Sequence, residues 1–167
     1  MNKWLISDTH FFHENIIKWE CFRTEFSNVE FMNEFIIQQW NDTVNPADTV
    51  YHLGDFALGT NMEAIENLIK RLNGKIHLIL GNHDTPRKVK LYAQLLPFVS
   101  GCVVLPGKRC CLTHFPVMLD ESEAHAMYSR VNIHGHIHEK EKCPNDAQHI
   151  GIAWDLERKI YNLDELV

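Results

Sequence analysis

The sequence predicts an α/β fold, because short apolar runs alternate along it with segments of helical period. The most informative run, 76–80, is rich in Ile and Leu and stops at Gly81, as expected of a buried strand. Stretches that open with capping signatures predict amphipathic helices between the strands. With 167 residues, 45% hydrophobic and 23% charged, the chain is expected to form one domain, 1–167.

The N-terminal third predicts two strands and one long helix. Residues 3–7 form the first strand and 48–53 the second. Between them, 11–26 has no clear period and predicts a loop or short helical turn over the site. Ser27 and Glu30 form a capping box, so the long helix is expected to begin there. Its wide apolar face comprises Val29, Phe31, Met32, Phe35, Ile36 and Trp40.

The remainder continues the alternation. Thr60 and Glu63 form a second capping box, and an Asn-Gly pair ends that helix before strand 76–80. Thr85 and Pro86 predict the N-cap and first residue of the next helix. The later elements are a hairpin of strands 102–105 and 109–113, a helix over 120–130, a strand over 131–134, and one or two closing strands within 149–161.

Composition argues against several classes of protein. A net charge of −6 disfavours a dedicated nucleic-acid binder. Five cysteines without a C-x-x-C pair predict reduced thiols in a cytoplasmic protein. The N-terminus turns polar too early for a signal peptide, and no apolar run has membrane-spanning length, so we expect no membrane partner. Eleven histidines favour metal binding or acid–base chemistry.

Metal-type ligands follow the ends of five predicted strands. Open α/β sheets place their chemistry at the carboxyl ends of strands. Side chains two apart in an extended segment point to the same side, so the Asp-x-His and His-x-His pairs can each serve one centre or two adjacent ones. The complete set is Asp8, His10, Asp55, Asn82, His114, His136 and His138.

This mixture of imidazole and oxygen ligands suits Mn, Fe, Zn, Co or Ni better than Ca. Seven ligands exceed what one tetrahedral or octahedral ion uses. We therefore expect two divalent transition-metal ions about 3.5–4 Å apart, with one carboxylate bridging them.

In chain order, Asp-x-His, Gly-Asp, Gly-Asn-His-Asp, His-Phe-Pro and Gly-His-x-His resemble the motifs of the calcineurin-like metallophosphoesterases, and the chain looks like their small single-domain bacterial and phage-type members. The resemblance spans 8–138. It implies a four-layer αββα sandwich of two mixed sheets flanked by helices, with a dimetal site on loops at one end. It also implies the roles of the site residues: Asp8, His10 and His138 on the first ion, Asp55 bridging, Asn82, His114 and His136 on the second, His83 as the acid near the leaving group, and Asp84 as its orienting partner.

Charge counting describes the expected reaction. Two divalent ions bring four positive charges, while Asp8, Asp55 and a bridging hydroxide remove three, which leaves a positive site for an anionic phosphate ester. Metal binding makes hydroxide available near neutral pH. We expect it to attack phosphorus in line while His83 protonates the departing alkoxide. The expected substrate is a small phosphodiester or nucleotide-type ester, and Mn is the expected ion.

Other polar residues have two interpretations each. Arg23 is predicted to clamp a phosphate oxygen, because guanidinium pairs bidentately with phosphate, or else to form a surface salt bridge. His13 and Asn15 either face substrate or only pack the loop. Five more histidines are expected to be ordinary core or surface groups: His52, His77, His125, His134 and His149.

Two other functions stay open. A nuclease would use Arg87, Lys88 and Lys90 to follow a phosphate backbone, although such a run is usually a solvated helix face. A non-catalytic scaffold of the same fold would bind protein partners instead. Scaffolds of this kind lose the histidine that His83 matches, and here it is present.

Overall fold

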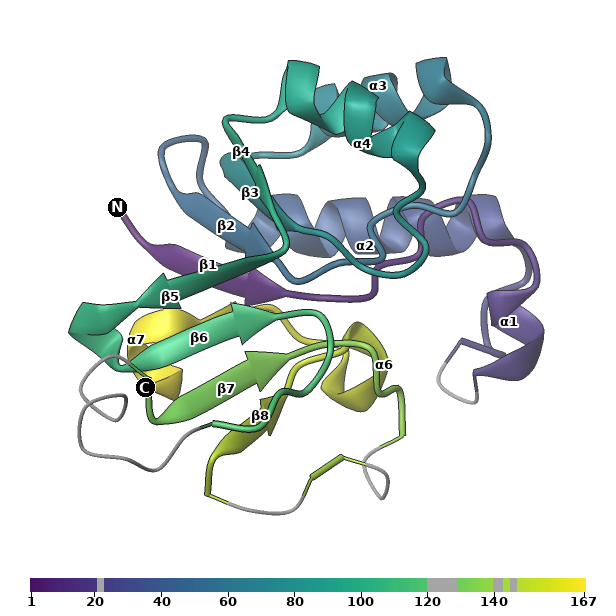
Figure 1. The fold of residues 1–167 in the computed structure, drawn as a ribbon. Helices are drawn as coiled ribbons and strands as arrows, with labels where there is room; N and C mark the ends of the chain where they lie inside the picture. The colour runs from purple at the N-terminus through teal and green to yellow at the C-terminus, as the bar shows by residue number, and fades with distance from the viewer. Residues whose placement is uncertain (21–22, 120–128, 140–142, 145–146) are drawn as a thin grey trace.

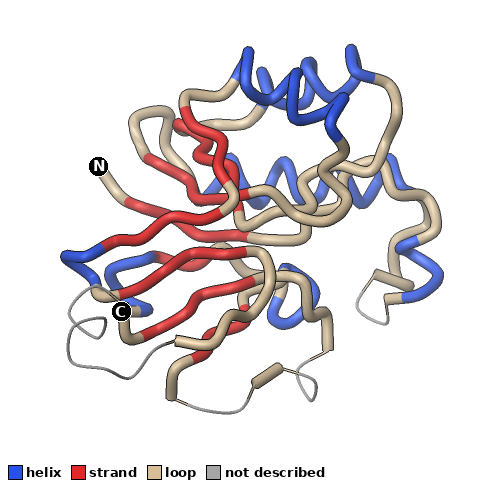
Figure 2. The backbone as a smooth tube through the Cα atoms, in the orientation of Figure 1, coloured by secondary structure: helices blue, strands red, loops and turns tan. Residues whose placement is uncertain are grey.

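The computed structural model describes residues 1–20, 23–119, 129–139, 143–144 and 147–167. Two β-sheets pack against each other, and the longer helices lie on the side of the first sheet that faces away from the second (Figures 1 and 2). Each sheet contains parallel and antiparallel neighbours. The predicted α/β class, with two mixed sheets flanked by helices, is confirmed.

The first sheet has the strand order β4-β3-β2-β1-β9. Its strands are β1 (Lys3–Ile6), β2 (Thr49–His52), β3 (Lys75–Ile79), β4 (Phe98–Ser100) and β9 (Tyr161–Asn162). β1 to β4 are parallel, and only β9 runs the other way. The carboxyl ends of β1, β2 and β3 therefore lie at one edge of this sheet.

The second sheet has the order β5-β6-β7-β8. Its strands are β5 (Cys102–Leu105), β6 (Cys110–Thr113), β7 (Val131–His134) and β8 (His149–Gly151). The predicted hairpin is confirmed, with a short 3₁₀ turn, Pro106–Lys108, between β5 and β6. Figure 1 shows the arrowheads of β1, β6 and β7 pointing the same way, so the ligand-bearing ends of both sheets meet at one end of the molecule.

Within the described residues, three longer helices cover the first sheet and three are short. They are α1 (Ile16–Trp19), α2 (Val29–Thr43), α3 (Met62–Arg71), α4 (Pro86–Leu95), α6 (Trp154–Glu157) and α7 (Leu163–Leu166). α4 begins as predicted, with Thr85 as N-cap and Pro86 in its first turn. Among the described residues, no helix combines the length and the apolarity needed to cross a membrane.

Strand alternation divides the core into two layers. Ile6 of β1 belongs to the cluster beneath the helices, together with Trp40 of α2. Its neighbour Leu5 belongs to the cluster between the sheets, together with Leu112 of β6 and Ile133 of β7. β2 and β3 alternate in the same manner, because successive side chains of a strand point to opposite faces. The first sheet is thus buried on both faces, which explains its near-continuous apolar strands.

The helix starts differ from prediction by one residue. α2 is capped by Asn28, whose Oδ1 accepts from the Phe31 N–H at 2.8 Å. α3 is capped by Asn61, whose Oδ1 accepts from the Ala64 N–H at 3.1 Å. Both predicted capping boxes were wrong because Asn caps as well as Ser or Thr, so the pattern alone does not select between adjacent polar residues.

Other differences concern the periphery. Phe31 and Phe35 were expected on the buried face of α2 but are 57% and 40% exposed, so the apolar face is narrower than predicted. The tail contains α6 and α7 in addition to β8 and β9, and β4 had no sequence signal. Most of the helix predicted over 120–130 lies outside the described residues.

The cap of α2 can be tested with adjacent substitutions. Asn28→Ala should lower the free energy of unfolding by about 1 kcal/mol, since the Phe31 N–H loses its acceptor. The matched control Ser27→Ala should change it by less than about 0.5 kcal/mol, because Ser27 is exposed and precedes the cap. Urea denaturation measures both free energies of unfolding. Equal losses in the two variants would contradict the assignment of Asn28 as the N-cap.

Asp48, in the turn before β2, fastens the start of the chain. Its Oδ2 accepts from Trp4 Nε1 at 3.0 Å and from the Asn45 N–H at 3.1 Å, and its Oδ1 accepts from the Asn2 N–H at 2.7 Å. These hydrogen bonds, led by that of Trp4, lower the pKa of Asp48 to about 2. Because this folded pKa is below the unfolded value of about 3.9, the stabilisation is present above that value and is lost as the pH falls towards 2.

Asp48→Asn should therefore lower the melting temperature at neutral pH, and the gap between parent and variant should narrow as the pH drops from about 5 to about 2.5. Thermal unfolding at a series of pH values measures the gap. A gap that stays constant would show that the charge of the carboxylate is not what stabilises this turn.

Candidate metal centre

The loops after β1, β2, β6 and β7 bring together most of the predicted ligands. Within the described residues, ligand atoms of Asp8, His10 and His138 all lie within 4.8 Å of one another, and so do those of Asp8, Asp55 and His114. Asp8 belongs to both groups. Asp55 Oδ2 also faces both, 3.8 Å from His10 Nε2 and 3.4 Å from His114 Nε2. The arrangement offers two adjacent cation sites with carboxylates between them.

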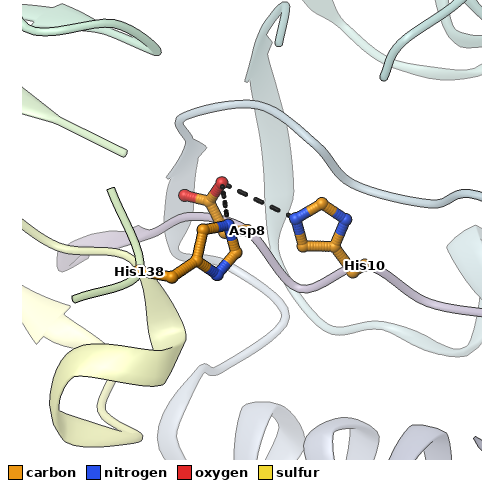
Figure 3. Close-up of side chains that lie close together, drawn as sticks. All are labelled: Asp8, His10 and His138. Atoms are coloured by element: carbon orange, nitrogen blue, oxygen red, sulfur yellow. Dashed lines mark ion pairs between the residues drawn. The ribbon is translucent and has the colours of Figure 1, made fainter. Parts of the chain in front are cut away.

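The first group is built around one carboxylate oxygen. Asp8 Oδ1 lies 3.5 Å from His138 Nε2 and 3.8 Å from His10 Nε2, and both rings turn towards it from different segments (Figure 3). Asp8 Oδ1 and His10 Nε2 are buried and have no hydrogen-bond partner among the described residues. Buried polar atoms are normally paired. A divalent cation between these lone pairs would satisfy them, so the residues fit a metal.

His114 leads to the same conclusion in the second group. Its Nδ1 lies 2.8 Å from the Leu53 carbonyl, which can only accept, so Nδ1 carries the proton. Nε2 of a neutral His114 then directs a lone pair towards Asn82 Oδ1 at 3.0 Å and Asp55 Oδ2 at 3.4 Å. Three acceptors facing one another require a shared cation, either a proton on His114 or a metal ion.

The electrostatics of the first group follow from burial. Burial raises the pKa of the Asp8 carboxyl, against the opposing effect of His138 and His114. Burial also lowers the pKa of His10 well below 6.5, helped by the positive charge of Arg23. A neutral His10 has a free lone pair, which is the form that coordinates a metal.

Four of the predicted ligands have a left-handed backbone conformation. Asp8, His10, Asp55 and His136 have φ values of 57°, 49°, 55° and 67°, a region that costs non-glycine residues of order 1–3 kcal/mol each. Hydrogen bonds between the loops hold two of these turns: the Asp8 N–H donates to the Gly54 carbonyl and the His10 N–H to the Asp55 carbonyl, both at 3.0 Å. Strained residues that a surrounding structure over-determines cluster at functional sites.

Two glycines allow the loops to approach closely. A Cβ on Gly135 would collide with Ser7 Oγ and Asp8 Oδ2, and one on Gly81 would collide with Asp55 Oδ1. This explains why glycine precedes Asn82 and His136 in the sequence: the backbone at these points lies directly against a ligand carboxylate.

The structure places Asp84 differently from the expectation that it orients His83. Asp84 Oδ2 accepts from the backbone N–H groups of Gly81 at 2.9 Å and Asp55 at 3.0 Å, and no hydrogen bond joins Asp84 to the His83 ring within the described residues. Burial raises the pKa of Asp84 to about 6. Asp84 therefore joins the loops after β2 and β3, because its Oδ2 accepts from one backbone N–H of each loop.

His83 itself lies at the rim of the centre. Its side chain is 45% exposed, and its Nε2 lies 3.9 Å from Asp55 Oδ2. The backbone is fixed on both sides: its N–H donates to Asp55 Oδ1 at 2.8 Å, and its carbonyl accepts from Lys88 Nζ at 2.6 Å. The ring is therefore held beside the candidate ligands while its edge reaches solvent.

Arg23 is neither a phosphate clamp nor a surface ion pair, so both predictions for it were wrong. The side chain is fully buried and forms a bidentate ion pair with Asp155 through Nε and Nη2. Its remaining donors reach the carbonyls of Thr9 at 2.9 Å and Asp8 at 2.5 Å, and Met32 Sδ at 3.6 Å. With every donor used inside the protein, Arg23 cannot contact substrate, and instead it holds the turn that carries Asp8 and His10.

Asp155 is the residue that the sequence analysis missed. Its Oδ2 accepts from His138 Nδ1 at 2.6 Å, which leaves His138 Nε2 free to face Asp8. Burial would raise the pKa of Asp155, but Arg23 and His138 bring it below its usual value. A carboxylate behind a ligand histidine fixes its tautomer and orientation. No motif marks Asp155, because it lies on α6 in a tail that predicted only strands.

The other predicted site residues surround this centre. His136 is exposed, and its ring lies 5.1 Å from that of His114, outside both ligand groups, while its N–H donates to Asp8 Oδ2 at 2.9 Å. The His13 ring lies 5.8 Å from that of His10, and Asn15 is exposed. Of the remaining histidines, His52 and His134 are buried, His77 and His149 are half-buried, and His125 lies outside the described residues.

The role of Asp155 can be measured without an activity assay. Asp155→Asn removes the negative charge but keeps the size of the side chain, and Mn²⁺ affinity should fall about 10- to 100-fold. Calorimetric titration measures the affinity, and circular dichroism confirms the fold. Asp164→Asn is the matched control, since it removes a surface carboxylate that pairs with Lys108. An unchanged affinity in folded Asp155→Asn would contradict the role.

Three comparisons place this geometry among known proteins. A protein of unknown function from Aquifex aeolicus, known from its crystal structure, has the same fold, with a TM-score of 0.73 over 99% of both chains and 24% identity. An uncharacterized protein of Methanocaldococcus jannaschii is 52% identical over 82 residues, which are 48% of this chain and only 46% of that protein. The Gene 66 protein of Mycobacterium phage L5 is 29% identical over 163 residues, with 82% of this chain and 77% of that protein covered.

The family assignment rests on a longer match. The model of the calcineurin-like phosphoesterase superfamily domain matches residues 1–151, a range that contains every predicted ligand. That match agrees with the two mixed sheets, and with candidate ligand groups on the loops where they meet. The chain belongs to the calcineurin-like phosphoesterase superfamily.

Proposed function

We propose that this phosphoesterase-family chain hydrolyses a phosphodiester and uses two divalent ions, with Mn²⁺ as the first choice. The observation that carries the proposal is the Asp8 carboxylate, which is fully buried, shared by two ligand groups, and left with one oxygen that no described residue pairs. Two sites that share a carboxylate are the arrangement expected of a two-metal hydrolase. His10 and His138 would serve one ion and His114 the other, with Asn82 and His136 beside the second. Asp55, the predicted bridging ligand, faces both ligand groups.

The charges of the centre suit an anionic substrate. Asp8 and Asp55 are the acidic side chains of the two ligand groups, so two divalent ions leave an excess of positive charge. Such ions supply a charge that holds phosphate oxygens and a lowered pKa for attacking water. Asn82 adds a neutral carbonyl oxygen beside His114, at 3.0 Å, without removing charge. The protein thus leaves the centre positive enough to attract a phosphodiester anion.

His83 is the proposed proton donor. Its imidazole reaches solvent beside Asp55, close enough to meet a departing oxygen, and its backbone is fixed by Asp55 and Lys88. In the reaction, the oxygen of water forms a bond to phosphorus and the bond from phosphorus to the leaving oxygen breaks. His83 gives its proton to that oxygen, and the proton lost by water goes to solvent. Alkoxide is a poor leaving group, so this proton accelerates the step.

The rival functions receive less support. Of the basic run considered for a nuclease, Lys88 is buried and donates to the carbonyls of Ala57 at 2.5 Å and His83 at 2.6 Å. Only Arg87 and Lys90 remain exposed, which is little charge to follow a phosphate backbone. A scaffold would need neither His83 nor two ligand groups that share a buried carboxylate. A small diester is therefore preferred as the substrate.

Two substitutions separate metal binding from proton donation. His83→Ala should keep Mn²⁺ affinity and lose about 10²- to 10⁴-fold in kcat, the usual share of a general acid. Asp55→Ala should lose both, because it removes a carboxylate that faces both ligand groups. Calorimetry with Mn²⁺ and turnover of bis-p-nitrophenyl phosphate measure the two properties. His77→Ala, which removes a half-buried imidazole of β3, is the matched control.

The same assay tests the kind of ester. The parent protein should cleave bis-p-nitrophenyl phosphate faster than p-nitrophenyl phosphate, and chelation should abolish both activities. Full activity of His83→Ala would overturn the proton donor. A Mn²⁺-loaded parent that leaves both esters intact would overturn the proposed function and favour the scaffold.

A further inference from the structure

Two cavities open beside the centre, and one segment separates them. Residues 58–60, here called the ridge, line both. One cavity, of about 200 Å³, contains His83 and Asn82 and is called the His83 cavity. The other, of about 510 Å³, contains His13 and Asn15 and is called the His13 cavity. Each cavity thus lies beside a different histidine at the rim of the centre.

The ridge is fixed relative to both histidines. The Leu58 N–H donates to the Phe11 carbonyl at 2.8 Å, which pairs the ridge with the segment that follows His10. Just before the ridge, the Ala57 carbonyl accepts from Lys88 Nζ, which also donates to the carbonyl of His83. Lys88 is buried, so this connection is shielded from solvent. The partition between the cavities is therefore a built part of the site and not a free loop.

Phe12 supports the ridge from the other side. A Cβ added to Gly59 would lie only 2.9 Å from Phe12 Cβ, so the aromatic side chain packs directly on this glycine. Phe12 itself has a left-handed backbone, with φ of 65°, and its N–H donates to Asn33 Oδ1 of α2 at 3.2 Å. The wall of the His13 cavity is thus connected to a long helix.

The two cavities differ in charge. The His83 cavity contains Arg87, which is exposed and forms no ion pair or hydrogen bond with another described residue. Lys88 also lines it, but its ammonium is occupied by two carbonyls. The His13 cavity contains the exposed carboxylate of Glu14, and no Lys or Arg among its described lining residues. An additional negative charge on a substrate would be attracted to the first cavity and repelled from the second.

We propose that the two substituents of the phosphodiester lie in separate cavities, and that the His83 cavity takes a leaving group with a further negative charge, such as a second phosphate. The proposal rests on the proposed function, in which His83 protonates the departing oxygen, so the substituent beside His83 is the one that leaves. Leu58 and Met62 give this cavity apolar surface for the body of that group. Arg87 pairs with its extra charge.

Binding of two nucleotides to the Mn²⁺-loaded protein tests the charge recognition. The probes are adenosine 5′-monophosphate and adenosine 3′,5′-bisphosphate, which differ by one phosphate, and calorimetry gives the ratio of their Kd values. In the parent, the bisphosphate should bind about tenfold more tightly, as one charge-assisted contact allows. Arg87→Gln should abolish most of this ratio. Lys90→Gln removes an equal charge from the same helix but lines neither cavity, so it should keep the ratio.

Turnover of bis-p-nitrophenyl phosphate by the same parent sample separates two kinds of failure. If the ester is cleaved but the parent does not prefer the bisphosphate, the assignment of the His83 cavity is wrong while the proposed function stands. Equal loss of the preference in Arg87→Gln and Lys90→Gln also overturns the assignment. The preference would then come from the overall positive charge of α4 and not from a contact with Arg87. If the ester is not cleaved, the proposed function fails and the assignment fails with it.

Discussion

The candidate metal centre is built around one buried carboxylate, that of Asp8. Asp8 has no solvent exposure, yet its Oδ1 finds no hydrogen-bond donor in the part of the chain that the structure describes. Removing an anion from water is costly unless positive charge or donors replace the lost hydration. Among the described residues, the His136 N–H donates to Asp8 Oδ2 at 2.9 Å, and the Nε2 atoms of His10 and His138 lie 3.8 Å and 3.5 Å from Asp8 Oδ1. A bound divalent cation, as the family implies, would supply the missing positive charge.

The surrounding structure holds this costly arrangement in place. Four predicted ligands adopt left-handed backbone, and isolated loops would relax from it. Arg23 counters that tendency, because it binds the carbonyls of Asp8 and Thr9 while its charge is balanced by Asp155. Removing one partner of a buried ion pair is far more costly than the pair is worth. The turn that carries Asp8 and His10 is thus held by a fully buried guanidinium.

The sequence predicts the parts of this site that depend on strand periodicity. Asp8 and Asp55 follow the parallel neighbours β1 and β2, and the ends of parallel strands meet at one edge of a sheet, so their convergence follows from pattern alone. His114 follows β6 of the second sheet, so its approach to them depends on how the two sheets pack. The contacts made by long side chains do not follow. Arg23 and Asp155 are 132 positions apart, and nothing local distinguishes a buried guanidinium from a solvated one. The hydrogen bonds of Asp84 do not follow from the pattern for the same reason, because its backbone donors come from two different loops.

The Arg23–Asp155 pair has a consequence for where this domain ends. The family match stops at residue 151, but the carboxylate that orients His138 and balances Arg23 lies beyond it, on α6. An expression fragment trimmed to the matched range would retain every predicted ligand and still leave a guanidinium buried without a counter-ion. The buried ion pair of Arg23 with Asp155 therefore requires residues beyond the matched range.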